Sequence, residues 1–154
     1  MKRTPIKRGK RPRRKSAHQV LVDEADAWAN AIAKQIYGDA CMLSHIPSPR
    51  CGGGIQGAHI LRKGGMYASI RYHRDNRLPI CRNHHIYWAH IYEHDFYEWV
   101  EATFPGRIEH LKETARAPHR KIDLKELICV LKSIHRAEQT RTAPAPAPAS
   151  HDTR

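Results

Sequence analysis

Four residues with metal-binding side chains lie in a part of the chain that has little apolar sequence of its own: Cys41, Cys51, Cys81 and His84. Between residues 39 and 57 the chain is rich in Pro and Gly, and a loop is predicted there. Such a segment cannot hold itself together by apolar burial, whereas a bound metal would contribute folding free energy directly. Structural zinc takes four Cys or His ligands, usually from two chain segments. The sequence therefore predicts a zinc site within residues 39–85.

The two predicted ligand pairs differ in spacing. Two residues separate Cys81 from His84, which lets both side chains reach one ion at a strand-to-helix turn. Nine residues separate Cys41 from Cys51, more than the roughly two to four of an ordinary zinc knuckle. His45 is a rival ligand that ranks below Cys51. The alternative is that Cys41 and Cys51 are simply loop and core cysteines.

The chain has no run of about 18 apolar residues, so no transmembrane helix and no membrane partner are predicted. Its N-terminus has charges but no apolar stretch behind them, which argues against a secretory signal. We therefore expect a cytoplasmic protein. In a reducing compartment four cysteines are more often metal ligands or core residues than disulfides.

Positive charge is concentrated in two parts of the chain. The first eighteen residues contain nine Lys or Arg and no acid, which accounts for nine of the formal net charge of +12. Such an arm cannot fold alone, and each cation that neutralises a nucleic-acid phosphate releases counterions. Between residues 50 and 85 the only acid is Asp75, so we expect DNA binding, with a solubilising terminus as the alternative for the arm. The cations predicted to contact DNA are Arg13, Arg14, Lys15, Arg62, Lys63, Arg71 and Arg74.

Apolar periodicity, caps and turns predict the secondary structure. A helix is expected from about His18 to Tyr37. Residues 55–61 and 68–72 are predicted as two strands joined by a glycine turn, and a helix begins near Arg82. Further helices are expected at residues 95–104, 107–115 and 124–138. The predicted class is α+β, with a small strand, strand, helix core flanked by α-helices.

These elements also predict the domain organisation. Residues 1–18 are expected to be a disordered basic arm, and residues 139–154, rich in Ala and Pro, a disordered tail. One domain is expected between them at residues 19–138, with its core at 39–95.

Three residues suited to catalysis follow one another through the predicted core: His59, Asn76 and His85. Their order, together with the zinc ligands, resembles the HNH branch of the His-Me finger (ββα-metal) nucleases. Phage-encoded members, among them the NinG/Rap recombination endonuclease family, are similar over about residues 26–137. The segments that carry the likeness are Gly57-Ala58-His59, Ile70-Arg71-Tyr72-His73-Arg74-Asp75-Asn76, Cys81-Arg82-Asn83-His84-His85 and Glu98-Trp99-Val100.

The resemblance implies a zinc-stapled ββα-metal core that cuts DNA phosphodiester bonds with Mg²⁺ or Mn²⁺. His59 would be the general base that takes a proton from the attacking water. His85 would bind the divalent ion. Asn76 would hold the hairpin and orient His59, and Arg71 would bind a phosphate near the cut.

One residue departs from the family pattern. Many HNH nucleases place Asp or His immediately before the base as a second metal ligand, where this chain has Ala58. His90, about one helical turn beyond His85, is a candidate to help bind the ion, with a packing or surface role as its alternative.

The resemblance favours a phage enzyme that acts in recombination on branched or nicked DNA. A resolving activity would require two active sites and hence a homodimer. Two alternatives stay open: a zinc-stapled DNA-binding module in which His59 is structural, and an accessory protein of phage DNA packaging or replication.

Overall fold

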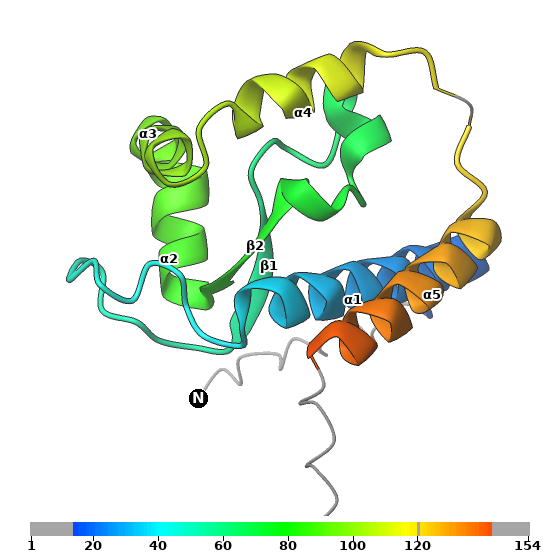
Figure 1. Ribbon diagram of the computed structural model, residues 1–154, viewed down its shortest axis with the longest axis horizontal. Coiled ribbons are helices and arrows are strands. Elements are labelled where there is room, and N and C mark those ends of the chain that lie inside the picture. The colour runs from blue at the N-terminus through cyan, green and yellow to red at the C-terminus, as the bar shows by residue number, and fades with distance from the viewer. Residues whose placement is uncertain (1–13, 120, 143–154) are drawn as a thin grey trace, which may run out of the picture.

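The computed structural model describes residues 14–119 and 121–142 (Figure 1). A two-stranded hairpin lies at the centre, with α3 and α4 on one side and a pair of helices, α1 and α5, on the other. The elements in chain order are α1 Ala17–Tyr37, β1 Ile55–His59, the 3-10 helices η1 Gly65–Ile70 and η2 Arg74–Asn76, β2 Arg77–Cys81, α2 Arg82–Ile86, the π-helical turn η3 Tyr87–Ile91, α3 Glu93–Thr103, α4 Arg107–Arg116 and α5 Leu124–Thr142. The α+β class predicted from the sequence is confirmed.

The first helix is fixed at both ends by local sequence. The Ser16 hydroxyl accepts a hydrogen bond from the Gln19 amide at 3.1 Å, as an N-cap residue does. Gly38 follows the last turn with φ +87°, a conformation that L side chains rarely adopt. The predicted helix is therefore confirmed, but it begins at Ala17. The disordered arm was predicted to reach residue 18, and residues 17 and 18 are helical instead; residues 1–13, with Arg13, lie outside the described part.

The hairpin differs from the prediction in its second strand. β1 pairs antiparallel with β2, with His59 opposite Arg77 and Ile55 opposite Cys81. The prediction that residues 68–72 form a strand was wrong, because η1 covers residues 65–70 and a turn follows. The predicted extension of the first strand to Leu61 was also wrong. The Asn76 side chain accepts a hydrogen bond from the Leu61 amide and donates to the Leu61 and Ile70 carbonyls. These backbone groups are therefore not available for pairing between strands.

The later helices agree with the prediction in kind and differ at their ends. α3 begins at Glu93, two residues before the expected start, and Gly106 with φ +76° separates it from α4. At the start of α5 the Asp123 carboxylate accepts from the amides of Lys125 and Glu126 at 2.8 and 3.2 Å. α5 continues through residue 142, so residues 139–142 are helical and not part of a disordered tail; residues 143–154 lie outside the described part.

Two apolar clusters hold the elements together. The larger joins the hairpin to η1, α3 and α4, and the smaller joins α1 to α5 through Ala25, Ala29, Ile32, Ile128 and Leu131. Fully buried members of the larger cluster include Leu43, Leu78, Ile80, Phe96 and Leu111. None of the helices in the part of the chain described is both long and apolar enough to span a membrane.

The Phe96 side chain tests the larger cluster because it is 0 % exposed. We expect Phe96→Ala to lower the free energy of unfolding by about 3–5 kcal/mol, since truncation removes a buried ring and leaves a cavity. Urea unfolding followed by circular dichroism in zinc-containing buffer measures this change. Val130→Ala on α5, where the side chain is 49 % exposed, is the matched control and should change stability by less than about 0.5 kcal/mol. A loss below about 1 kcal/mol for Phe96→Ala would contradict this packing.

Candidate active site and metal centre

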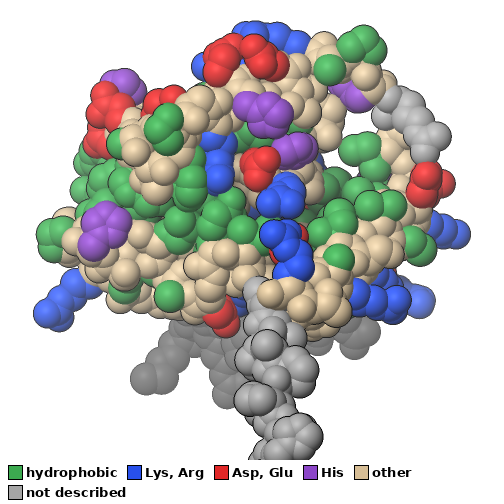
Figure 2. Space-filling view, viewed as in Figure 1, with side chains coloured by type: hydrophobic (Ala, Val, Ile, Leu, Met, Phe, Trp, Pro, Cys, Tyr) green, Lys and Arg blue, Asp and Glu red, His purple; other side chains and the backbone are tan. Residues whose placement is uncertain are grey.

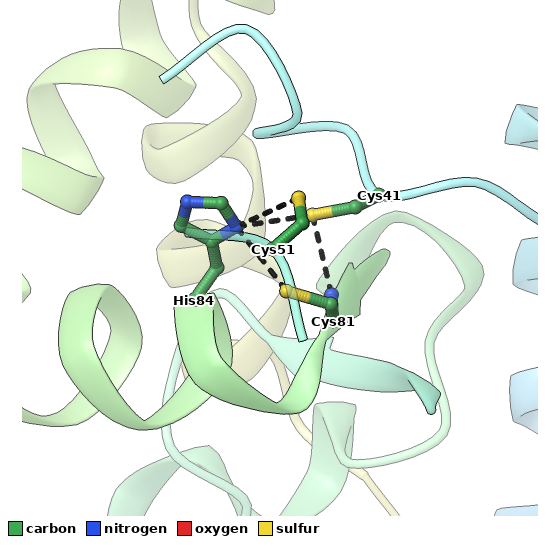
Figure 3. Close-up of side chains that lie close together, drawn as sticks. All are labelled: Cys41, Cys51, Cys81 and His84. Atoms are coloured by element: carbon green, nitrogen blue, oxygen red, sulfur yellow. Dashed lines mark hydrogen bonds between the residues drawn. The ribbon is translucent and has the colours of Figure 1, made fainter. Parts of the chain in front are cut away.

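The four predicted zinc ligands converge on one point (Figure 3). The Nδ1 atom of His84 lies 3.3 Å from the Cys41 sulfur, 3.5 Å from the Cys51 sulfur and 3.2 Å from the Cys81 sulfur. A ring nitrogen has either one proton or one lone pair, so hydrogen bonding can satisfy only one of these sulfurs. In a tetrahedral zinc site, bonds of about 2.3 Å to sulfur and 2.0–2.1 Å to nitrogen separate the S and N ligands by about 3.6 Å. The cluster therefore has the donor set and the spacing that bind a metal such as zinc.

Backbone groups support the cluster. The Cys81 amide donates to the Cys41 sulfur at 3.3 Å, and the Gly52 amide donates to the Cys81 sulfur at 3.5 Å. Burial raises the pKa of the Cys81 thiol, but hydrogen bonds with the amides of His84 and Gly52 and with the side chains of Cys41 and His84 together outweigh burial and lower this pKa to about 6. A thiolate is the form of cysteine that binds metal.

The loop before β1 brings Cys51 next to Cys41 although nine residues separate them in sequence. The amides of Arg82 and Asn83 donate to the carbonyls of Gly54 and Gly52 at 3.1 and 3.2 Å, which ties the loop to the start of α2. A Cβ on Gly52 would displace the Asn83 side chain, which donates to the Arg50 carbonyl at 3.1 Å, so glycine there preserves a further bond between the loop and the helix. His45, the rival ligand, is exposed and outside the cluster, and Cys51 completes the ligand set.

A cleft of about 410 Å³ adjoins the hairpin and contains three of the predicted catalytic or metal-binding residues, His59, His85 and His90. Ile60, Arg62, Lys63, Ala89 and Glu93 complete its lining. The three histidines come from the end of β1, from α2 and from η3. The cleft therefore brings together residues that lie up to 34 positions apart in the sequence.

His85 is oriented by a residue that the sequence analysis did not identify. Its Nδ1 atom lies 2.8 Å from Oε1 of Gln56 on β1. Because Oε1 can only accept, Nδ1 donates the proton, and Nε2 keeps its lone pair. Burial, followed by the charges of His90 and Lys63, lowers the pKa of His85 to about 4. The ring is therefore neutral at cellular pH, which is the form that binds a metal.

The π-helical turn sets the position of His90. In η3 the Tyr92 amide donates to the Tyr87 carbonyl at 2.9 Å, one residue further than in an α-helix. Residues five apart consequently lie above one another, and the rings of His85 and His90 stack with their centroids 4.8 Å apart. The predicted proximity of His90 to His85 is confirmed, although the turn that produces it is π-helical.

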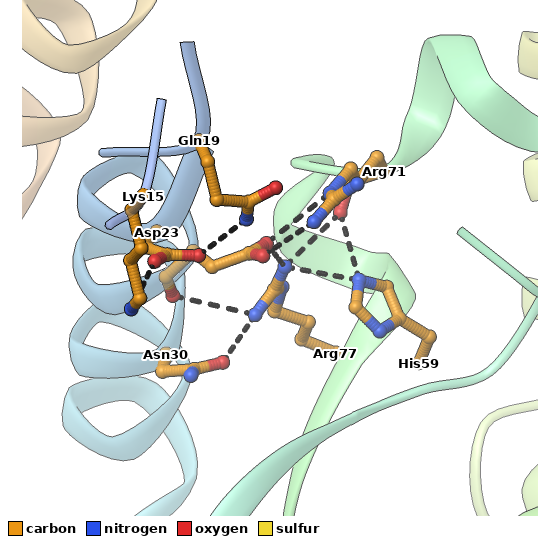
Figure 4. A network of polar contacts seen from close by, with 8 residues as sticks. Lys15, Gln19, Asp23, Asn30, His59, Arg71 and Arg77 are labelled. Atoms are coloured by element: carbon orange, nitrogen blue, oxygen red, sulfur yellow. Dashed lines mark hydrogen bonds and ion pairs between the residues drawn. The ribbon is translucent and has the colours of Figure 1, made fainter. Parts of the chain in front are cut away.

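His59 lies next to two arginines (Figure 4). Its Nε2 atom is 2.9 Å from Nη2 of Arg77 and 3.2 Å from the carbonyl oxygen of Arg71. Nε2 can accept from Arg77 or donate to the Arg71 carbonyl, and only the second arrangement leaves a lone pair on Nδ1. Burial, followed by the positive charge of Arg77, lowers the pKa of His59 to about 3. The ring is neutral at cellular pH, as a general base must be.

The two arginines beside His59 are paired with Asp26 on α1. The Asp26 carboxylate accepts two hydrogen bonds from Arg71, at 3.3 and 2.5 Å, and one from Nη2 of Arg77 at 2.6 Å. Burial alone would raise the pKa of Asp26, but these bonds outweigh burial and lower it. Nothing in the sequence distinguished Asp26 from the neighbouring acids of α1. Asp26 and Arg77 are 51 residues apart, so the sequence did not predict that they pair.

Asn76 is buried and bonds only to backbone in the described contacts. Its Oδ1 accepts from the Leu61 amide at 2.7 Å, and its Nδ2 donates to the carbonyls of Leu61 and Ile70 at 3.1 and 3.2 Å. These bonds hold the loop between the strands next to the end of β1, which carries His59. Asn76 thus supports the hairpin that carries the cleft, and its side chain has no direct bond to the imidazole among these contacts.

The predicted DNA-binding cations occupy different environments. Lys63 is exposed and lines the cleft. Arg62, 77 % exposed, pairs with Glu93 at 2.8 Å, whereas Arg71 is half-buried against Asp26. Arg74 lies 3.5 Å from Asp75. In the arm, Arg14 is exposed and Lys15 pairs with Asp23 at 2.6 Å.

Comparisons with known proteins found no matching family model, no matching curated protein and no matching solved structure. The resemblance to the HNH nucleases therefore stays a prediction from the sequence.

We expect the protein purified without added zinc to hold about one tightly bound zinc per chain, because the three sulfurs lie 3.2–3.5 Å from Nδ1 of His84, close to the S–N spacing of a tetrahedral zinc site. Cys81→Ser should lose this zinc, and a chelator should unfold the wild-type domain. Elemental analysis and circular dichroism measure the two effects. Cys129→Ser, at an exposed position on α5, is the matched control and should keep the metal. Zinc-free wild-type protein with full helical content would contradict a structural zinc.

The lowered pKa of His59 predicts a pH dependence with a definite sign. The folded pKa of about 3 lies below the roughly 6.5 of an unfolded chain. The neutral ring therefore contributes stability above about pH 6.5, and this contribution is lost as the pH falls toward 3. Side-chain nitrogen NMR should show no titration of His59 between pH 7 and about 5, and normal titration in urea. A midpoint near 6 in the folded protein would refute the burial described here.

Proposed function

We propose that this chain is a metal-dependent DNA endonuclease of the HNH (His-Me finger, ββα-metal) type. The observation that carries the proposal is the cleft in which His59 from β1 meets His85 and His90 from the helical segment after β2. The hairpin and the Cys/His cluster hold these segments together, as the ββα-metal pattern requires.

His59 is proposed as the general base. Its neutral imidazole can take a proton from water at Nδ1 when Nε2–H donates to the Arg71 carbonyl, 3.2 Å away. Asn76 supports this arrangement indirectly, because its three backbone bonds fix the loop that follows His59.

His85 is proposed as the ligand of the catalytic ion, with His90 beside it. Gln56 holds the His85 ring so that Nε2 keeps its lone pair. A Mg²⁺ or Mn²⁺ ion bound there would stabilise the charge that develops on the phosphate and on the leaving oxygen. Ala58, in the usual position of a second ligand, is 0 % exposed and cannot coordinate, so water and DNA phosphate would complete the ion's shell.

Two cations of the cleft are suited to bind phosphate. Lys63 is exposed and lines the cleft, and Arg62 pairs with Glu93 while its side chain stays 77 % exposed. Ion pairs with an exposed partner hold a side chain weakly. Arg62 can therefore exchange Glu93 for a DNA phosphate. Arg71 would bind phosphate only by sharing its guanidinium with Asp26, so it contributes less than Lys63 in this proposal.

The second candidate is a zinc-stapled DNA-binding module without catalysis. The contact between Arg77 and Nε2 of His59 favours it, because an accepting Nε2 would place the proton on Nδ1 and leave no lone pair for water. In that case the cations would bind phosphate while His59 had only a structural role.

A cleavage assay separates the two candidates. We expect the wild-type protein to cut DNA with Mg²⁺ or Mn²⁺, and His59→Ala to cut it about 10²–10⁴-fold more slowly while binding it equally well. Supercoiled, nicked and branched substrates are compared, because the resemblance points to a recombination intermediate. Gel analysis of the products and fluorescence anisotropy measure cutting and binding.

His94→Ala is the matched control, since His94 is a histidine outside the cleft whose side chain is 85 % exposed. It should cut at the wild-type rate. If wild type and His59→Ala both bind every substrate but cut none with either ion, the nuclease proposal is wrong and the binding module stands.

A further inference from the structure

We propose that His73, Asp75 and His110 form a second metal site, which takes a divalent transition-metal ion such as Zn²⁺ or Co²⁺. One potential ligand atom from each residue lies within 4.8 Å of those of the other two. His73 precedes η2, Asp75 lies within it, and His110 lies on α4. The site is distinct from the Cys/His cluster and from the cleft, because none of its residues belongs to either.

The carboxylate of Asp75 is oriented for this site. Its Oδ1 atom lies 3.5 Å from Nε of Arg74, while Oδ2 lies 3.9 Å from Nδ1 of His73. Arg74 is itself anchored, with Nη1 3.8 Å from a carboxylate oxygen of Glu138 on α5. The arginine thus engages one oxygen and leaves the other toward the imidazole.

The tautomer of His73 also fits metal binding. The Asp75 amide donates to Nδ1 of His73 at 3.3 Å, so Nδ1 is the unprotonated nitrogen. This hydrogen bond is long, and the lone pair that it engages lies on the side of the Asp75 carboxylate. An ion there would replace a weak bond to the amide with a bond to the metal.

His110 is contributed by a separate element, α4. Its ring centroid is 5.9 Å from that of His73, with the ring planes at 64°. Ligands of one ion with bonds of about 2.0–2.2 Å lie about 3–3.5 Å apart, so binding would draw the side chains together by roughly 1 Å. Because His110 is exposed, rotation of its side chain can supply this movement. Histidine, acidic and basic side chains gather in a row between α4 and the α1–α5 pair (Figure 2).

The donor set indicates the kind of ion. Two imidazoles and one carboxylate are borderline and hard ligands, which suit Zn²⁺, Co²⁺ and Mn²⁺, and three protein ligands leave a position for water. The Cys/His cluster, with three thiolates, binds such ions more tightly. An ion at the second site would join α4 to η2. It would therefore stabilise the segment between β1 and β2, whose last residue is Asn76.

Metal titration tests this proposal on the full chain with His85→Gln and His90→Gln, because an ion bound in the cleft would otherwise add an equivalent of its own. After the Cys/His cluster has been filled with one equivalent of Co²⁺, we expect further Co²⁺ to bind as a second, weaker equivalent. The thiolate-to-cobalt absorption should stop rising at the first equivalent, because the second site has no sulfur. Equilibrium dialysis with elemental analysis counts both equivalents, for Co²⁺ and separately for Zn²⁺.

Two conservative variants locate the second ion. His110→Gln and Asp75→Asn should each lose the second equivalent and keep the first, whereas His94→Gln, at an exposed position on α3, should keep both. His110 is exposed, so its replacement should leave the fold intact, and an unchanged circular dichroism spectrum checks this. If the chain without the cleft ligands binds one equivalent, or if both variants made in it retain two, the proposal is overturned. Because the readout is bound metal, the result is independent of whether the protein cuts DNA.

Discussion

The arrangement of the whole chain depends on one buried charge, the guanidinium of Arg77. This side chain is 2 % exposed, and a charge removed from water to that extent destabilises the fold unless it is paired and hydrogen-bonded. α1 supplies the partners: the Asp26 carboxylate at 2.6 Å, the Asp26 carbonyl at 3.4 Å and the Asn30 amide oxygen. Satisfying this charge fixes α1, and with it α5, against β2. Gly57 belongs to the same constraint, because a Cβ at that position would overlap the Asn30 side chain.

The register of the short hairpin places the Cys/His cluster and the cleft at opposite ends of the two strands. At one end Cys81 pairs with Ile55, and the metal cluster forms where β2 passes into α2. At the other end Arg77 pairs with His59, where the cleft begins. His84 and His85 are adjacent in sequence, but a helix turns successive side chains by about 100°, so one ring reaches the cysteines and the next reaches Gln56. Two paired strands of five residues can thus support a buried Cys/His cluster and a separate cleft that share no residue.

Sequence reasoning succeeded where the signal was local. The helices followed from periodicity and caps, and the Cys81–His84 pair from its spacing. It failed at the second strand because the short run around Pro79 has no strand pattern in the sequence. This segment is a strand because all of its residues are buried by the tertiary packing, which the sequence does not reveal. Residues 68–72 were predicted as a strand, but the Asn76 side chain donates to the Ile70 carbonyl there. Gln56, Asp26 and Arg77 were missed as parts of the site for a related reason. Each acts through a partner 29 to 51 residues away, and no spacing rule connects such pairs.

The proposed role of His59 as a base depends on how Arg77 divides its hydrogen bonds. Nη2 of Arg77 lies 2.6 Å from the Asp26 carboxylate and 2.9 Å from Nε2 of His59. A hydrogen bond between two charged groups is stronger than one from a charged donor to a neutral ring. The bond to Asp26 is therefore favoured, and the hydrogen bond from Arg77 to His59 is the weaker of the two. Nε2 can then donate to the Arg71 carbonyl, and the lone pair moves to Nδ1. A helix outside the strand, strand, helix unit would in this way decide which nitrogen of the base has the proton.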